Sequence, residues 1–168
     1  MSIVLARIDS RLVHGQILEG WVPFTGSTMI IVADDRAAVN LFQQKVMKMA
    51  VPEYIKLKIE SVSEAVDDIT NHVYDDERVM VLFSSPHAAY EAFSKGLKCD
   101  CINLGNVNYM QGRKQVTSCV ALDNDIVNDL RALMEKGVKI DVRGVPRESP
   151  LDIDEVIDNY LDLCRRNP

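Results

Sequence analysis

Short apolar runs alternate with helix-patterned stretches along the chain, and this alternation limits the fold more than any other feature of the sequence. Runs rich in Val, Ile and Leu are typical of strands that are buried on both faces. Between most of these runs, apolar residues recur at intervals of three and four, as along one face of a helix. The sequence therefore predicts an α/β fold: a single open, mainly parallel sheet of about seven strands with helices on both faces. The expected strands are residues 2–8, 28–35, 54–61, 78–85, 101–105, 114–123 and 138–145, and the expected helices are residues 37–50, 61–74, 87–96, 124–137 and 153–165.

Length and composition narrow the function classes. The 168 residues fit one domain, and a net charge of −6 argues against a nucleic-acid binder, which needs a basic face. There is no apolar run of about 18 residues, so no membrane span is expected, and charges at positions 7 and 9 come too early for a signal peptide. Buried, reduced thiols are expected at the four cysteines, which favours a cytoplasmic location. The cysteines are Cys99, Cys101, Cys119 and Cys164.

The loop after the first expected strand is the densest in chemical groups. Ligands of open α/β sheets bind outside the carboxyl ends of the strands, where this loop lies. The imidazole of His14 is a suitable nucleophile toward phosphorus, and Arg11 is a suitable ligand for phosphoryl oxygens. Backbone N–H groups near Gly15 add donors, and Asp9 is expected to bond the imidazole or to hold Arg11. The four residues predict a phosphoryl-transfer site; the alternative is a salt-bridged loop without catalytic function.

Other candidates follow the second and fourth strands. Ser84 is expected near the phosphate, and His87 either lies near the site or only opens a helix. Asp34 and Asp35 are interpreted as structural or capping residues, with a Mg²⁺ site as the alternative. His72 falls among acidic residues and is expected to be solvated, and Trp21 is expected in the core rather than at a partner surface. The absence of P-loop, dinucleotide and nucleophile-elbow motifs argues against those enzyme classes.

The stretch ARIDSRLVHGQILEGW (residues 6–21) resembles the opening motif of the IIB components of the sugar phosphotransferase system, mannose/sorbose type. The family pattern is approximately R-I-D-x-R-L-x-H-G-Q-V/I, followed by a tryptophan. Residues 29–52, 102–116 and 137–146 resemble later segments of the family, so the similarity extends over essentially the whole chain. The motif begins at residue 6, so residues 1–168 are expected to form a stand-alone IIB domain without a fused IIA domain.

The resemblance implies a phosphocarrier of the phosphoenolpyruvate-dependent system, a transferase of the protein-Nπ-phosphohistidine–sugar type. His14 is then the phosphohistidine, modified at Nδ1, with Arg11 and Asp9 as the motif's phosphate-binding arginine and acid. The implied partners are a IIA donor protein, the membrane components IIC and IID, and a sugar; no metal or other cofactor is implied. The sugar is not determined, and the oligomeric state, including a homo-oligomer, is left open.

Two departures and two alternative functions remain. Arg36 and the NVNYM stretch (residues 106–110) differ from the pattern expected of mannose members, which affects the edge of the site and the choice of sugar or partner. One alternative function is a phosphorylated regulatory module that is not coupled to transport; the other is a Mg²⁺-dependent phosphohydrolase that uses Asp34 and Asp35. Residues 60–77 carry seven acids and no base, so the acidity is expected to lie away from the transfer loop.

Overall fold

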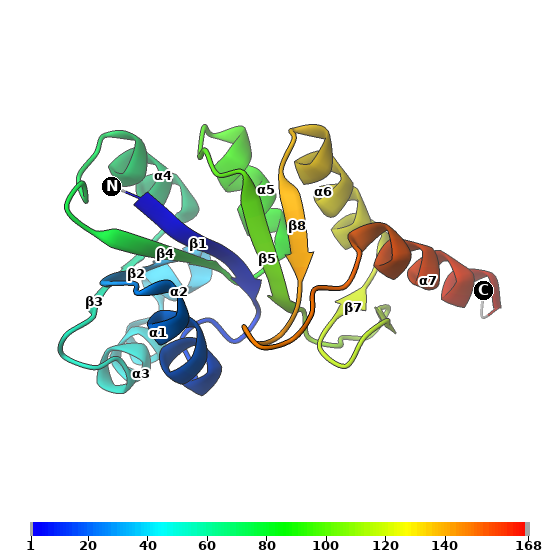
Figure 1. Cartoon of the computed structure of the whole chain (residues 1–168), viewed down its shortest axis with the longest axis horizontal. Coiled ribbons are helices and arrows are strands. Elements are labelled where there is room, and N and C mark those ends of the chain that lie inside the picture. Colours follow the sequence, from blue (N-terminus) through cyan, green and yellow to red (C-terminus); the bar gives the residue numbers. More distant parts are fainter. Residues whose placement is uncertain (1, 167–168) are drawn as a thin grey trace.

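A parallel six-stranded sheet forms the centre of the protein (Figure 1). The structure is a computed structural model that describes residues 2–166. The strand order is β3-β2-β4-β1-β5-β8, which places β1 in the interior of the sheet between β4 and β5. The strands are β1 (Ser2–Asp9), β2 (Met29–Ala33), β3 (Lys56–Glu60), β4 (Arg78–Phe83), β5 (Cys101–Asn106), β6 (Lys114–Gln115), β7 (Ala121–Leu122) and β8 (Lys139–Val142); the helices are η1 (Gln16–Trp21), α1 (Val22–Thr25), α2 (Asp35–Val39), α3 (Leu41–Ala50), α4 (Val62–Thr70), α5 (Pro86–Ser94), α6 (Asn124–Glu135) and α7 (Ile153–Arg166).

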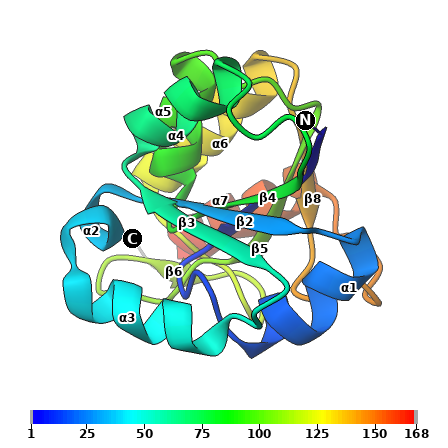
Figure 2. The same cartoon turned by 90° about the vertical axis from the view of Figure 1, so that its left-hand side faces the viewer.

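Helices cover both faces of the sheet, as the sequence predicts (Figure 2). On one face α4, α5 and α6 enclose the larger apolar core; on the other, η1, α1, α2 and α3 enclose a second one. Successive strand residues point to opposite faces, so Ile31 of β2 belongs to the first core and Ile30 to the second. Burial on both faces explains why these strands read as continuous apolar runs.

The predicted count of about seven strands needs one correction. The expected strand at residues 114–123 is instead an antiparallel ribbon of two short strands, β6 and β7, outside the parallel sheet. The hydroxyl of Thr117 accepts hydrogen bonds from the backbone N–H groups of Cys119 and Val120, which turns the chain between the two strands. The fold class is confirmed, with six strands in the main sheet rather than about seven.

The single helix expected over residues 37–50 is divided into α2 and α3. Asn40 lies between them with extended backbone, and its side chain accepts a hydrogen bond from Gln43 N, which caps α3. Periodicity does not reveal this break, because the apolar spacing continues across it.

The prediction of buried thiols is wrong for Cys101, which is exposed at the first residue of β5. The other three cysteines are only half-buried, and none of the four forms a disulfide. No helix within residues 2–166 is long and apolar enough to cross a membrane.

Candidate functional site

The segment of residues 10–15, called here the His14 loop, leaves the sheet at the carboxyl end of β1. Its first turn is closed by a hydrogen bond of 2.9 Å from Leu12 N to Asp9 O. Leu12 has a φ of 56°, in the left-handed region that non-glycine residues rarely occupy. The π-helical turn η1 follows the loop directly. Left-handed backbone and π-turns both concentrate at functional sites, where surrounding contacts hold them in place.

The carboxylate of Asp9 is fully buried and joins the charged groups of the site. Its Oδ1 accepts hydrogen bonds from Arg11 N at 3.1 Å and Arg11 Nε at 3.3 Å. Its Oδ2 lies 3.7 Å from Nε2 of His14. The structure therefore brings the predicted cation, Arg11, and the predicted imidazole, His14, together around the carboxylate of the predicted acid, Asp9.

Arg7, which the sequence did not predict as a site residue, forms a buried ion pair with Asp9. Its guanidinium is fully buried and donates to Asp9 Oδ2 at 2.8 Å and to the carbonyl of Gly144 at 3.1 Å. It also donates to the side chain of Asn103 and lies 5.0 Å from the centre of the Trp21 ring. Burial lowers the pKa of Arg7 from its ordinary value and the adjacent Asp9 opposes this shift, so the guanidinium stays charged.

Gly105 leaves the space that this guanidinium needs. A Cβ at position 105 would lie 2.0 Å from Cζ of Arg7, far inside van der Waals contact. Trp21 is buried, as expected, and its Nε1 donates to Gly144 O at 3.0 Å. Residues 103–105 and 143–144 thus surround the guanidinium of Arg7, and we call them the Arg7 seat.

The imidazole of His14 has both nitrogens occupied or covered. Nδ1 lies 2.8 Å from the carbonyl oxygen of Leu12, which can only accept, so Nδ1 carries a proton in this geometry. Nε2 is buried and has no hydrogen-bond partner within residues 2–166. The ring is therefore held between a backbone carbonyl on one side and the Asp9 carboxylate on the other.

Donors for an anion lie next to His14 along the chain. Within the described residues, the backbone N–H groups of Val13, His14 and Gly15 have no acceptor. The side chain of Arg11 is 39% exposed and also donates to Gln16 Oε1 at 2.8 Å. Free N–H groups and a cation near a helix start make a good setting for phosphate oxygens.

Ser84 and the two adjacent acids are engaged elsewhere. The hydroxyl of Ser84 donates to Asp34, and within residues 2–166 no hydrogen bond joins Ser84 to His14 or Arg11. Asp34 caps α2 by accepting from Ala37 N at 2.7 Å, and Asp35 accepts from Val62 N at 2.9 Å. Both acids therefore have the structural functions that the sequence favoured, and the described residues contain no group of three or more side chains suited to a metal.

The two other histidines lie outside the site. His72 is exposed, as expected, and faces Asp75 at 3.1 Å. His87 is in the first turn of α5 and faces Asp129 of α6 at 3.3 Å, on the opposite side of the sheet from the second core. Of the two possibilities for His87, the structure supports the helix opening.

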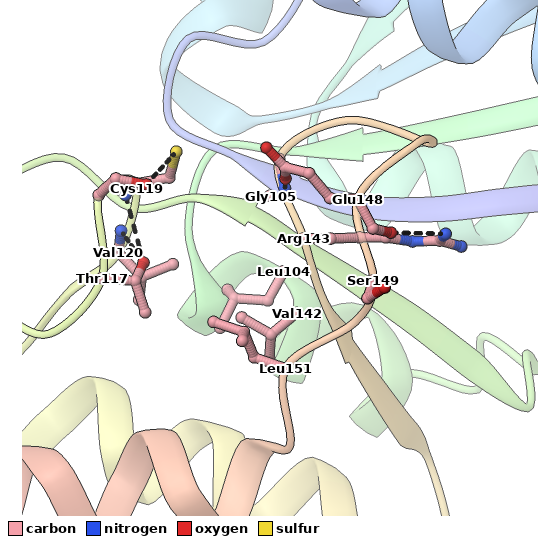
Figure 3. A pocket seen from close by; sticks show the side chains of 12 residues that line it. Leu104, Gly105, Thr117, Cys119, Val120, Val142, Arg143, Glu148, Ser149 and Leu151 are labelled. Carbon is pink, nitrogen blue, oxygen red and sulfur yellow. Dashed lines mark hydrogen bonds between the residues drawn. The ribbon is translucent and has the colours of Figure 1, made fainter.

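A cavity of about 260 Å³ shares part of its wall with the Arg7 seat, and Figure 3 shows the residues that line this cavity. Gly105, Arg143 and Gly144 belong both to the cavity wall and to the surroundings of Arg7. Glu148 uses its carboxylate to accept from Gly144 N at 2.8 Å, which stabilises the loop that carries the Gly144 carbonyl. The remaining wall consists of Leu104, Thr117, Ser118, Cys119, Val120, Val142, Ser149 and Leu151.

Comparison with known proteins decides the family. The family model described as PTS system sorbose subfamily IIB component matches residues 3–164. The chain belongs to this family. The sorbose-specific EIIB component of Klebsiella pneumoniae is 32% identical over 164 residues, which are 98% of this chain and 99% of the relative. An N-acetylgalactosamine-specific IIB component of Escherichia coli is 32% identical over 90% of this chain and 96% of its own length.

Solved structures agree with this IIB assignment. The IIBSor domain of the sorbose permease from K. pneumoniae superposes with a TM-score of 0.89 at 32% identity, covering 94% of this chain and 97% of that one. The mannose-specific EIIAB component of E. coli is 30% identical, and the chain spans 49% of its length. The protein is thus a sorbose-type IIB component of the sugar phosphotransferase system.

The sequence does contain one signal for the missed Arg7. Arg7 is in the expected strand of residues 2–8 and Asp9 follows that strand directly, two positions on; residues at this spacing in a strand point to the same face of a sheet. Opposite charges at this spacing inside an apolar run indicate a buried pair. The partners in residues 103 and 144 come from distant segments and had no such signal.

Proposed function

We propose that this IIB component is a phosphocarrier in which His14 takes a phosphoryl group from a histidine of a IIA protein and passes it to a sugar entering through the membrane components IIC and IID. The observation that carries the proposal is the position of Asp9. One buried carboxylate, fixed by Arg7, both holds Arg11 and faces the imidazole of His14. This arrangement resembles the way a carboxylate orients a catalytic histidine in acyl transfer.

The Asp9 carboxylate favours the tautomer that attack by Nδ1 requires, with the proton on Nε2. A proton on Nε2 faces the Asp9 carboxylate, 3.7 Å away, and leaves the lone pair on Nδ1. In the structure Nδ1 instead donates to the carbonyl of Leu12, which describes a resting ring. Before attack the ring must turn away from the Leu12 carbonyl, Nδ1 must release its proton to solvent, and Nε2 must carry a proton that faces Asp9; the lone pair on Nδ1 is then available for the incoming phosphorus.

The transfer itself then needs no proton release. The P–N bond to the donor histidine breaks as the bond from Nδ1 to phosphorus forms, and the donor nitrogen recovers its lone pair. Arg11 and the free N–H groups of Val13, His14 and Gly15 bind the equatorial oxygens, where charge must be stabilised. Handing the phosphoryl group to a sugar hydroxyl repeats the displacement in the opposite direction, and the hydroxyl proton leaves with solvent.

Mapping the phosphorylated residue tests this proposal. The protein is phosphorylated with its cognate IIA protein and the labelled histidine is located by mass spectrometry at alkaline pH, where phosphohistidine survives. We expect the label on His14, with ³¹P NMR assigning it to Nδ1. Label on His87 or His72 instead would contradict the proposal.

Replacing Arg11 with alanine is expected to slow transfer while leaving the fold intact. The side chain is partly exposed, and a charge-assisted hydrogen bond to a phosphoryl oxygen contributes about 1.5–3 kcal/mol. We expect the rate of transfer from phosphorylated IIA to fall roughly 10- to 100-fold by the same conversion. Quench-flow kinetics measure the rate, and Arg165→Ala, which removes a more exposed cation near the end of α7 that also pairs with an Asp, is the control. An unchanged rate would leave Arg11 with a structural function only.

A further inference from the structure

The segment formed by α2 and α3 points most of its apolar side chains away from the protein. Met47 is the only buried residue of α3, and it packs in the second core. Four of the five outward residues are 78–81% exposed, and the fifth is 51% exposed. Several exposed apolar side chains on one short segment are typical of an interaction site. We call these residues the α2–α3 stripe: Val39, Leu41, Phe42, Val46 and Met49.

The segment that carries the α2–α3 stripe lies on the same side of the sheet as the His14 loop. Ala37 of α2 and Met47 of α3 belong to the same apolar cluster as Leu12 and Val13 of the loop. The strand that precedes α2 is separated from β1 by β4 alone, or about 10 Å at the usual strand spacing. Figures 1 and 2 both place α3 beside the helix that follows the His14 loop.

A protein that delivers a phosphoryl group to His14 must cover this region. A specific interface buries about 800 Å² on each partner, which corresponds to a patch reaching roughly 16 Å from its centre. A patch of that radius centred on the carboxyl end of β1 extends past the carboxyl end of β2, where α2 begins. The stripe is therefore continuous with the surface that any donor protein has to touch.

Charge decides which occupant fits. Helices α2 and α3 (residues 35–50) contain three cations, Arg36, Lys45 and Lys48, and a single acid, Asp35, in a chain whose net charge is −6. Two copies docked through this face would bring six cations together, which opposes self-association. A partner with an apolar patch and carboxylates around its edge is complementary to both features.

We propose that the α2–α3 stripe is the part of the donor-docking surface that supplies affinity, and that its occupant is a phosphohistidine-bearing protein with an apolar, acid-rimmed face. This inference rests on the proposed role of His14 as phosphoryl acceptor. His14 and Arg11 perform the transfer, and the stripe holds the donor while it occurs. Loss of the stripe therefore weakens donor binding without slowing the transfer in the bound complex.

The test is the double variant Phe42→Ser/Met49→Ser, with cognate IIA, phosphorylated in advance, as the donor. Both residues are on the outer surface, so the fold is expected to survive. We expect KM for phosphorylated IIA to rise at least tenfold, since a few apolar anchors supply most of the affinity of an interface, with kcat within twofold of the wild type. Phosphoramidate, a small donor that needs no docking surface, should phosphorylate wild type and variant at the same rate.

Two further variants complete the design. Val73→Ser removes another exposed apolar side chain, in the segment between α4 and β4 at the amino end of β4, and should leave KM unchanged. Lys45→Glu/Lys48→Glu should raise KM at low salt and flatten its dependence on ionic strength.

Three outcomes would overturn the inference. If KM for phosphorylated IIA is unchanged in the stripe variant, the stripe is not part of the donor surface. If that variant has also lost a binding to anionic vesicles that the wild type shows, the stripe binds lipid instead. A wild-type dimer that the variant loses, again with unchanged KM, assigns it to a second copy of the chain. If neither IIA nor phosphoramidate phosphorylates the wild-type protein, the proposed function of His14 is wrong as well. This outcome differs from the two above, in which the wild type is phosphorylated.

Discussion

We expect the substitution His14→Ala to reduce phosphoryl uptake from phosphorylated IIA to background. The substitution removes the nucleophile, and the Arg11 and backbone donors that remain have nothing to which they can direct phosphorus. The measurement is incorporation of ³²P from phosphoenolpyruvate through the purified upstream proteins, with the product kept at alkaline pH. The side chain of His14 is mostly enclosed but belongs to a surface loop, so the variant should keep its circular dichroism spectrum and unfolding midpoint.

Matched controls come from the other histidines. His72→Ala and His87→Ala remove exposed imidazoles that also face a carboxylate, and both should accept phosphate at the wild-type rate. If the His14→Ala protein still takes up acid-labile label, the assignment of the acceptor is wrong. If it loses label only because it has unfolded, the spectrum will show this.

The second large effect is expected for Arg7→Met, which should destabilise the protein by about 3–5 kcal/mol. Methionine fills much of the same volume but leaves the carboxylate of Asp9 buried without its main partner. The carbonyl of Gly144 and the side chain of Asn103 lose a donor as well. Urea unfolding followed by circular dichroism measures the change in the free energy of unfolding.

A double variant tests whether the orphaned charge is the cause. Arg7→Met/Asp9→Asn removes both charges, so part of the lost stability should return even though phosphoryl transfer should not. Equal destabilisation of the single and double variants would show that lost packing, rather than the unpaired carboxylate, dominates.

The substitution Gly105→Ala tests the Arg7 seat by placing a methyl group where the guanidinium of Arg7 lies. The added Cβ meets the guanidinium of Arg7 itself, which is held by four acceptors and cannot move aside. We expect a loss of about 1–3 kcal/mol in the free energy of unfolding, as for other overpacked cores, together with slower transfer. Gly20→Ala is the control, because its Cβ would make only an ordinary contact of 3.7 Å with Pro146. Equal effects of the two substitutions would argue against a rigid seat.

Sequence patterns predicted the elements that local spacing determines. Buried parallel strands have to be apolar on both faces, so β1, β2, β4 and β5 were found within a few residues. The concentration of charged groups after β1 identified the His14 loop, since parallel strands present their carboxyl ends at one edge of the sheet.

Features that depend on distant contacts were not accessible in the same way. The seat of Arg7 comes from residues 96 to 137 positions away along the chain, and no local pattern encodes such a contact. Periodicity found the apolar face of residues 37–50, but it could not say whether that face meets the core or a partner. In the structure most of the apolar residues on that face are exposed. The break between α2 and α3 at Asn40 was not predicted, because the spacing of apolar residues continues across it.

The order in which the chain is synthesised adds a consequence of the Arg7 seat. Every reactive residue of the site is made within the first sixteen positions, whereas the carbonyls that fix Arg7 come from residues 143 and 144. A nascent chain therefore contains the imidazole long before it contains the support that orients it. Competence to accept phosphate is expected to arise only when β8 has joined the sheet, so that incomplete chains do not divert phosphoryl groups from finished carriers.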